Sequence, residues 1–398
     1  MIVIVAFTIV TLFYCLASRW ISLSILTGPL VFTAAGVAAA MLLPNIGASQ
    51  STTNSLHFSE IGLVLLLFTD AAGMNPAGLR SAASLPARLL LIGLPLSLFI
   101  GTILGWWILP GLTLLEAAIL AAILVPTDAG LGEAILTNER IPQSIREGLN
   151  VEAGLNDGLA VPFLLFFIAA AAAPTSGAGN SLHVYVVEQL GYGICLGMGI
   201  GLAGGYALGL AARRGWMSDS FGQVGIMALP ALCLLLSEMI SASMFIAAFV
   251  AGLCVQRGFP EAARHSLAFS RLWGQVLSLA VFFLFGLAAV HFRNDFTFAA
   301  LAYSIASLTV VRILPVVIAL IGTGTTARAK LFIGWFGPRG LASIVLGLVF
   351  LEREVPLPGE ITIRTTVILT VLLSIALHGL SARPGAALLA RDEDIAAR

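Results

Sequence analysis

Charged side chains are scarce in this chain. Only 10% of its 398 residues are Asp, Glu, Lys or Arg, whereas a soluble domain has about 25%. Hydrophobic residues make up 59%, and the mean hydropathy is +1.02. Apolar runs of about 20 residues recur from end to end, and each is long enough to cross a ~30 Å hydrocarbon core. The sequence therefore predicts an all-α polytopic membrane protein and excludes a sizeable soluble domain.

Further shortages exclude other classes of protein. There is no basic patch with interleaved aromatic residues, so we expect no nucleic-acid partner. The four cysteines lie far apart in apolar stretches, which indicates buried core residues rather than metal ligands. The five histidines are scattered and suggest no metal-binding or nucleophile–base pair, so we expect neither an enzyme nor a resident cofactor.

Thirteen membrane spans are expected. Their predicted limits are 1–17, 21–43, 60–75, 86–109, 112–137, 148–172, 184–211, 221–237, 241–256, 272–291, 297–320, 329–350 and 362–382. They form one transmembrane domain over 1–398, with a first half at 1–183, a linking helix at 184–213 and a second half at 221–383. The tail after the last span is about fifteen residues, too short for a nucleotide-binding regulatory domain, which needs about 50 or more.

Basic residues between the spans indicate the orientation. Fifteen of the twenty Lys and Arg residues fall on the side of the C-terminus, three fall on the other side, and Arg312 and Arg339 fall inside spans. The positive-inside rule then places the C-terminus in the cytoplasm and the N-terminus outside. We expect an integral protein of a prokaryotic inner (plasma) membrane, in contact with lipid.

Two helix breakers occupy corresponding positions in the two halves. Pro126 interrupts the fifth span in "LVPTDAG", and Pro338 interrupts the twelfth in "WFGPRGL". Their separation (338 − 126 = 212 residues) is close to the offset between the first and eighth spans. Because the halves begin on opposite sides of the membrane, the pattern predicts an inverted-repeat transporter with its site near the bilayer midplane.

Glycines recur every fourth residue in the linking helix, at Gly193, Gly197, Gly201, Gly205 and Gly209. Residues four apart share a helix face. The spacing therefore predicts a stripe against which the backbone of another helix packs closely, and we interpret it as structural.

Polar residues interrupt the sixth span, in "VEAGLNDG". An ionisable residue at membrane depth costs about 2.5–3.5 kcal/mol, so its presence indicates a paired or functional group. Glu152 and Asn156 share a helix face, which suits a cationic partner such as Arg312. Asp157 points about 140° away from Glu152. A buried carboxylate there can take a proton or a small cation, but hardly both.

The fifth span supplies complementary groups. Pro126 removes a helical donor and disturbs the turn before it. The carbonyls freed in this way, together with the Thr127 hydroxyl, are oxygen ligands for a hard cation. Asp128 adds a negative charge that needs a partner such as Arg339. Any one of these residues fits a structural ion pair equally well, but the cluster favours an ion-transport site.

At these residues the chain resembles the monovalent cation/proton antiporter superfamily, on its sodium/proton exchanger (NhaP-like, Asn-Asp signature) branch. The matching motifs are Pro-Thr-Asp at 126–128, Glu-x-x-x-Asn-Asp at 152–157, an arginine in "LTVVRILPVV", "GPRG" for Gly-Leu-Arg-Gly, and a "HGLSARP"-like run at 378–384. The resemblance covers nearly the whole chain, in order. Two positions depart from it, because Ala153 stands where many members have serine and Pro338 replaces leucine.

The resemblance implies an NhaA/NhaP-like antiporter fold, in which broken, crossing fifth and twelfth spans lie beside the sixth, in a protein that usually dimerises. The ion- and proton-binding residues it implies are Asp157 as carrier, Thr127 as a second ligand of the monovalent cation, and Asp128, Glu152 and Asn156 around them. Arg312 would hold Glu152 and Asn156, and Arg339 would hold Asp128.

The leading hypothesis is a secondary antiporter that exchanges protons for Na+ or Li+, with both ions competing for one carboxylate. A second carboxylate at Asn156 could carry an additional charge through the cycle, and an amide cannot, so we expect electroneutral exchange. A potassium/proton antiporter stays open, although its branch typically has Asp at the position of Asn156. A cation channel is a further alternative, against which we find no selectivity-filter sequence. No cofactor beyond the transported ions is expected.

Overall fold

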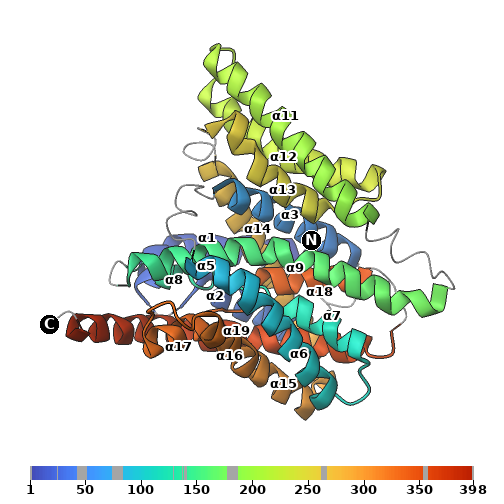
Figure 1. Ribbon diagram of the computed structural model, residues 1–398, viewed down its shortest axis with the longest axis vertical. Coiled ribbons are helices and arrows are strands. Elements are labelled where there is room, and N and C mark those ends of the chain that lie inside the picture. Colours follow the sequence, from blue (N-terminus) through green and yellow to red (C-terminus); the bar gives the residue numbers. More distant parts are fainter. Residues whose placement is uncertain are drawn as a thin grey trace. The chain divides into compact units, whose positions relative to one another are not determined.

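The computed structural model describes the chain except for residues 1, 25, 43–51, 74–83, 129, 137, 139–140, 177–186, 261–266, 353–356 and 397–398. Within the described residues it consists of helices and their connections, without a β-strand (Figure 1). Each of the thirteen predicted spans overlaps at least one helix. The prediction of an all-α polytopic protein is confirmed.

The helices of the first six predicted spans are α1 (Ile2–Leu23), α2 (Gly28–Leu42), α3 (Thr52–Gly73), the continuous run α5–η1–α6 (Ser84–Arg88, Leu89–Gly93 and Leu94–Ile108), the pair α7 and α8 (Leu114–Leu124 and Glu133–Leu136), and α9 (Gln143–Ser176). The linking helix comprises η2 and α11 (Val187–Tyr192 and Gly193–Arg213).

The remaining helices are α12 (Asp219–Met239), α13 (Met244–Gly258), α14 (Leu267–His291), the short η4 (Arg293–Asp295), the pair α15 and α16 (Phe298–Leu308 and Val310–Ala319), the pair α17 and α18 (Ala327–Trp335 and Leu341–Glu352), and α19 (Glu360–Ala396). The predicted thirteenth span ends too early, because α19 continues to Ala396 instead of ending near residue 382. Its extension stays helical because Ala386 and Leu389 are buried in a hydrophobic cluster with Phe332 of α17.

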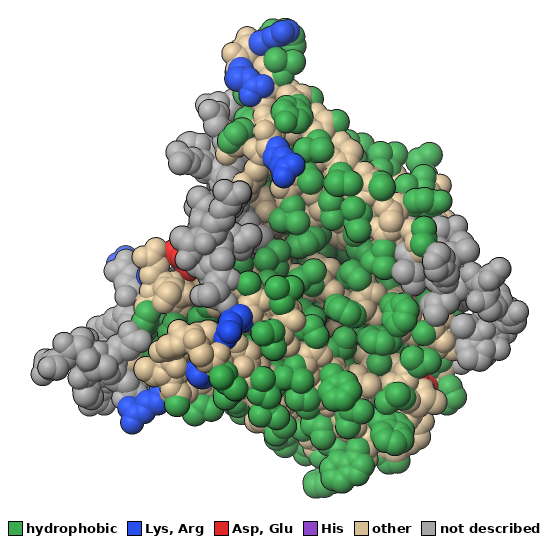
Figure 2. Space-filling view, viewed as in Figure 1, with side chains coloured by type: hydrophobic (Ala, Val, Ile, Leu, Met, Phe, Trp, Pro, Cys, Tyr) green, Lys and Arg blue, Asp and Glu red, His purple; other side chains and the backbone are tan. Residues whose placement is uncertain are grey.

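Length and composition agree with membrane insertion. Eight helices in the described part of the chain are long and apolar enough to cross a bilayer, and four shorter apolar helices accompany them. Two of the short ones, α7 and α18, are halves of the interrupted fifth and twelfth spans. Hydrophobic side chains cover much of the visible surface (Figure 2). Large apolar residues such as Trp107 and Phe298 are exposed. Such a surface is typical of a protein that faces lipid rather than water.

By their contacts, the helices group into two compact units. The first unit comprises Met1–Leu56, Ala82–Asn156 and Leu279–Arg398, and the second comprises His57–Ser81 and Asp157–Ser278. The boundary passes through α9, between Asn156 and Asp157. These units are defined by contacts, whereas the predicted halves at 1–183 and 221–383 are defined by an inverted repeat. The inverted repeat remains a prediction.

Within the second unit, the glycine stripe of α11 packs against α13. All five glycines are buried. A Cβ at Gly197, Gly201 or Gly205 would overlap the backbone carbonyl of Ala247, Ala251 or Val255 respectively, so the two helix backbones lie in direct contact. The predicted role of this stripe as a close-packing surface is confirmed.

Candidate functional site

Two interrupted helices cross within the first unit. Helix α7 ends at Leu124 and α17 ends at Trp335, and residues 126–128 and 336–340 are not helical. The Asp128 N–H donates to the Pro338 carbonyl at 2.8 Å, so the two breaks are joined by a backbone hydrogen bond. Proline at 126 and at 338 explains why both helices stop here, since neither residue offers an N–H to continue the helical pattern.

The Asp128 carboxylate binds backbone amides at the crossing. Its Oδ2 accepts from the Leu341 N–H and its Oδ1 accepts from the Gly130 N–H, both at 2.7 Å. Leu341 is the first residue of α18, whose N-terminus carries unsatisfied amides and a partial positive charge. The structure thus places amides at Asp128, where the resemblance implied the Arg339 guanidinium.

Arg312 of α16 and Glu152 of α9 form a buried, bidentate ion pair. Arg312 Nη2 donates to Glu152 Oε2 at 2.8 Å, and Nη1 donates to Oε1. The two side chains are 6% and 3% exposed. Parallel hydrogen bonds of this kind are the strongest form of carboxylate–guanidinium contact. The structure therefore brings together these two residues in the manner that their positions suggested.

Asn156 has a different partner from the one expected. Its Nδ2 donates to the Thr127 hydroxyl oxygen at 2.6 Å, and both side chains are buried. The amide oxygen, Oδ1, is also buried and accepts no hydrogen bond from any residue in the described part of the chain. An oxygen left in that state is costly unless a further group binds it. The Asn156–Thr127 hydrogen bond connects the sixth span to the break in the fifth.

Glycines allow the charged groups to approach the break at 336–340. A Cβ at Gly337 would overlap the Arg312 guanidinium, and a Cβ at Gly340 would overlap the Asp128 carboxylate. Arg339 lies between these glycines with 1% exposure, and its Nη1 donates to the Gly337 carbonyl. Its charge interacts with those of Arg312 and Glu152. Arg339 therefore belongs to the same buried charge cluster as the Arg312–Glu152 pair.

Asp157 follows Asn156 on α9 and is buried. By its contacts it groups with the second unit, whereas the other six predicted site residues lie in the first. Successive helical residues differ by about 100° around the axis. The two members of the Asn-Asp signature thus point in different directions from one helix.

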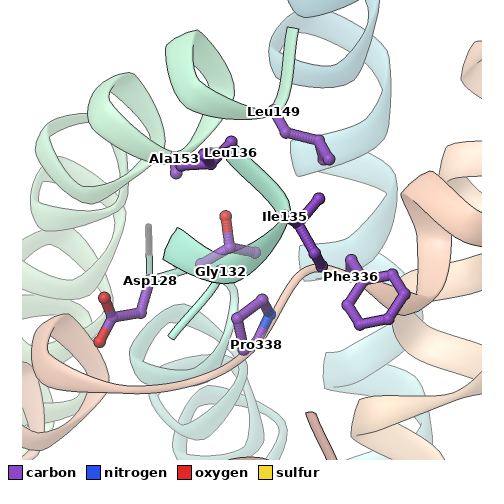
Figure 3. Close-up of a pocket in the computed structure, with 9 residues that line it drawn as sticks. Asp128, Gly132, Ile135, Leu136, Leu149, Ala153, Phe336 and Pro338 are labelled. Atoms are coloured by element: carbon purple, nitrogen blue, oxygen red, sulfur yellow. The ribbon is translucent and has the colours of Figure 1, made fainter. Parts of the chain in front are cut away.

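A small, partly open pocket, with room for about one water molecule, lies at the crossing. The residues that line it are Thr127, Asp128, Gly132, Ile135, Leu136, Leu149, Ala153, Phe336 and Pro338. Figure 3 shows Asp128 on one side of this pocket, and Ile135, Leu149 and Phe336 on the other. Both departures from the family pattern, Ala153 and Pro338, therefore lie in the lining of the pocket.

Two polar residues near the break escaped the sequence analysis. Ser374 and His378 of α19 contact Arg339 and Trp335, at the two ends of the break. His378 begins the "HGLSARP"-like run at 378–384, but the sequence assigns it no role. The available signal was its spacing of four residues from Ser374, which places both side chains on one face of a helix.

The chain is similar to several named cation/proton antiporters. It is 25% identical over 328 residues to the K+/H+ antiporter NhaP of Alkalimonas amylolytica, which covers 82% of this chain and 56% of that protein. It is 26% identical over 254 residues to Na+/H+ antiporter 2 of Zygosaccharomyces rouxii, which covers 60% of this chain and 31% of that protein. The chain thus spans little more than half the length of the first relative, and less of the second.

The fold is also similar to a solved one. The structure of the sodium proton antiporter MjNhaP1 from Methanocaldococcus jannaschii at pH 8 matches with a TM-score of 0.79, covering 98% of this chain and 97% of that one. Sequence identity to it is 18%, so the likeness concerns the fold. The sequence pattern of a family described as "Sodium/hydrogen exchanger, transmembrane" matches residues 4–387. This match covers nearly the whole chain, and the protein belongs to the sodium/hydrogen exchanger family.

Proposed function

We propose that this protein is a secondary active antiporter that exchanges protons for a monovalent cation by alternating access. The observation that carries the proposal is the pair of oxygens at the crossing of the broken helices. Thr127 Oγ1 accepts from Asn156 Nδ2, which keeps the buried Asn156 Oδ1 close by without a donor in the described residues. A dehydrated monovalent cation needs such oxygen ligands in place of its water shell.

The pocket at the crossing lies beside Thr127, which supplies one of the two oxygens. Thr127 and Asp128 line it directly, and its opposite side is apolar. The Asp128 carboxylate is already bound by two amides, which fix its position. We therefore assign Asp128 the role of holding the crossing and attracting cations, rather than that of the carrier.

Asp157 is the carboxylate that we assign to carry the ion. A proton and a cation compete for it, and the protein changes its access only when one of them is bound. Asp157 is buried on α9 directly after Asn156, whose Nδ2 binds Thr127 at the break. One carboxylate that alternates between protonated and cation-bound forms carries the same charge on both legs of the cycle. Exchange is then electroneutral.

Sodium is the cation that we propose first, and potassium is the second candidate. The relatives differ on this point, since the Alkalimonas amylolytica protein is named a K+/H+ antiporter and the Zygosaccharomyces rouxii protein a Na+/H+ antiporter. Asn156 favours sodium, because the potassium branch typically has Asp at that position. Ala153 lines the pocket without the hydroxyl that serine would add, and fewer oxygens favour a larger, more easily dehydrated ion, so potassium is the second candidate. We also propose a homodimer in the prokaryotic inner membrane, with the C-terminus in the cytoplasm.

The test is proton flux in proteoliposomes, measured with an internal pH dye after addition of Li+, Na+ or K+. We expect at least one of these ions to move protons in the opposite direction. Asp157→Asn, which keeps the size of the side chain, should abolish the flux while the protein still folds. Asp295→Asn is the matched control, because Asp295 is an exposed aspartate in η4. Flux that persists in Asp157→Asn, or no flux with any of the three ions, would overturn the proposal.

A further inference from the structure

One helical hydrogen bond is missing at the break between α17 and α18. In a continuous α-helix, the N–H of residue 339 would donate to the carbonyl of residue 335, four positions earlier. Here Trp335 is the last residue of α17 and residues 336–340 are not helical, and the Arg339 N–H donates to Ser374 instead of the Trp335 carbonyl. Backbone groups buried in a membrane protein require other partners.

Two side chains of α19 connect these two backbone groups. The Arg339 N–H donates to Ser374 Oγ at 2.6 Å. Ser374 Oγ lies 3.1 Å from His378 Nδ1, and His378 Nε2 lies 2.9 Å from the Trp335 carbonyl oxygen. The Trp335 carbonyl also accepts from the Gly337 N–H at 2.9 Å, which its second lone pair allows.

The Arg339 N–H and the Trp335 carbonyl, at the two ends of this series of contacts, limit which atoms between them can donate. A carbonyl only accepts, so His378 Nε2 carries a proton and donates it to Trp335. Ser374 Oγ accepts from an amide, so its own hydroxyl proton is available to His378 Nδ1, which accepts it. With its proton on Nε2, the neutral imidazole donates to the Trp335 carbonyl and accepts from the Ser374 hydroxyl. Nδ1 also lies 3.0 Å from the Ser374 carbonyl oxygen, to which it donates only when it carries a proton itself.

The same face of α19 contacts the end of α17 at further points. Ser381, three residues after His378, lies 2.9 Å from the Trp335 indole nitrogen, which donates to its hydroxyl. The rings of Trp335 and His378 are 4.9 Å apart. A Cβ at Gly385 would overlap Phe336, so that aromatic ring packs directly on the α19 backbone. The end of α17 is therefore held by α19 along several turns.

We infer that Ser374 and His378 are positioning residues for exchange, because together they replace the broken helical hydrogen bond and keep residues 336–340 unwound. The unwound segment is what places Gly337 against Arg312, and Gly340 with the Leu341 N–H against Asp128. Neither side chain needs to touch the transported ion. Their effect on transport rests on the proposed function, and their effect on the break does not.

The inference predicts that the two residues act as one unit. Removing either one interrupts the connection between Arg339 and Trp335, so removing both should add little to the larger single effect. Residues that act independently would instead give additive effects. His378→Gln keeps an N–H donor on a side chain of similar reach and should restore part of what His378→Leu removes.

The experiment compares Ser374→Ala, His378→Leu, His378→Gln and the Ser374→Ala/His378→Leu double variant with the original protein. Ser381→Ala is the matched control, because it removes a hydrogen bond to the same tryptophan from the same helix face without involving the backbone. The first measurement is amide hydrogen exchange, followed by mass spectrometry, of peptides that cover 336–341. We expect exchange about tenfold faster in Ser374→Ala and in His378→Leu, and unchanged in Ser381→Ala.

The second measurement is the half-saturation constant for the cation in proteoliposomes. We expect a rise of about fivefold in both single variants, a similar rise in the double variant, and partial recovery in His378→Gln. Unchanged hydrogen exchange at 336–341, or additive effects in the double variant, would overturn the inference. If hydrogen exchange behaves as expected but the original protein transports none of the three cations, the role of Ser374 and His378 in the break holds and the proposed function fails.

Discussion

Both units contain glycines at close contacts, but the groups that these glycines contact differ. In the second unit, Gly197 and Gly201 of α11 lie against carbonyls of α13, an uninterrupted helix whose backbone groups are already hydrogen-bonded. In the first unit, Gly337 and Gly340 lie in the non-helical segment 336–340. Gly337 contacts the Arg312 guanidinium, and Gly340 contacts the Asp128 carboxylate. The first arrangement gives close, apolar packing between two rigid helices. The second places charges beside amides and carbonyls that the break has left available.

This difference indicates a division of labour. Packing between two continuous helices holds their relative position without polar groups that respond to ions. A break surrounded by Asp128, Arg339 and Arg312 is instead held by individual hydrogen bonds, each of which depends on a charge or a donor. We therefore expect substitutions in the α11 stripe to change stability, and substitutions around the break to change ion handling as well.

The largest effect is expected from Arg312→Ala. Removing one member of a buried ion pair leaves the other charge without compensation, which costs about 3–5 kcal/mol. Thermal unfolding in detergent should show a larger loss of stability in Arg312→Ala than in Asp157→Asn. The double variant Arg312→Met/Glu152→Leu removes both charges and should recover much of the loss. Equal melting temperatures for Arg312→Ala and Asp157→Asn would contradict the structural role of the pair.

Gly201→Ala and Gly340→Ala test the comparison directly. Overpacking at a tight contact destabilises a protein by about 1–3 kcal/mol, and both substitutions introduce an overlap. In Gly201→Ala we expect a lower melting temperature with an unchanged half-saturation constant for the cation. In Gly340→Ala we expect the half-saturation constant to change too, because the new methyl group displaces Asp128 from the Leu341 N–H.

The control for both is Gly199→Ala, on α11 but with nothing within 4 Å of the added methyl group. Its melting temperature should stay the same or rise slightly, since alanine favours a helix more than glycine does. A changed half-saturation constant in Gly201→Ala, with an unchanged one in Gly340→Ala, would contradict the assignment of Gly201 to packing and of Gly340 to ion handling.

Much of this arrangement could be predicted from the sequence. Apolar length predicted the membrane spans, each of which overlaps a helix, and Pro126 and Pro338 predicted both breaks, because these are one-dimensional signals. The Arg312–Glu152 contact followed from intramembrane charge and helix geometry. The partners of Asp128 could not be predicted, since the amides of Leu341 and Gly130 become available only when two breaks meet in space. The same reason applies to His378, whose role depends on a helical bond broken elsewhere.

Asn156→Asp sharpens the distinction between fixed and ion-responsive groups. Asn156 binds Thr127 at the break, and an added carboxylate there could bind an additional proton during the cycle. The original protein should be insensitive to membrane potential, whereas one net charge per cycle would respond by about 2.3 kcal/mol per 100 mV. The measurement is transport in liposomes at an imposed potential of either sign, generated with a permeant anion so that potassium is absent. A response in the original protein would contradict electroneutral exchange.

The smallest expected effect concerns Ala153, which lines the pocket where many family members have serine. Ala153→Ser adds a hydroxyl near Thr127 and Asp128, which line the same pocket, without adding charge or much volume. An extra oxygen compensates more of the dehydration of a small ion, so the ratio of Na+ to K+ affinity should rise a few-fold, roughly 1 kcal/mol at most. Ala203→Ser, on helix α11 of the second unit, is the control. That variant should leave the ratio unchanged, because α11 contributes no residue to the pocket lining. If both serines shift the ratio equally, cation preference is not set at the crossing, and the division between a packed region and an ion-responsive one does not hold for selectivity.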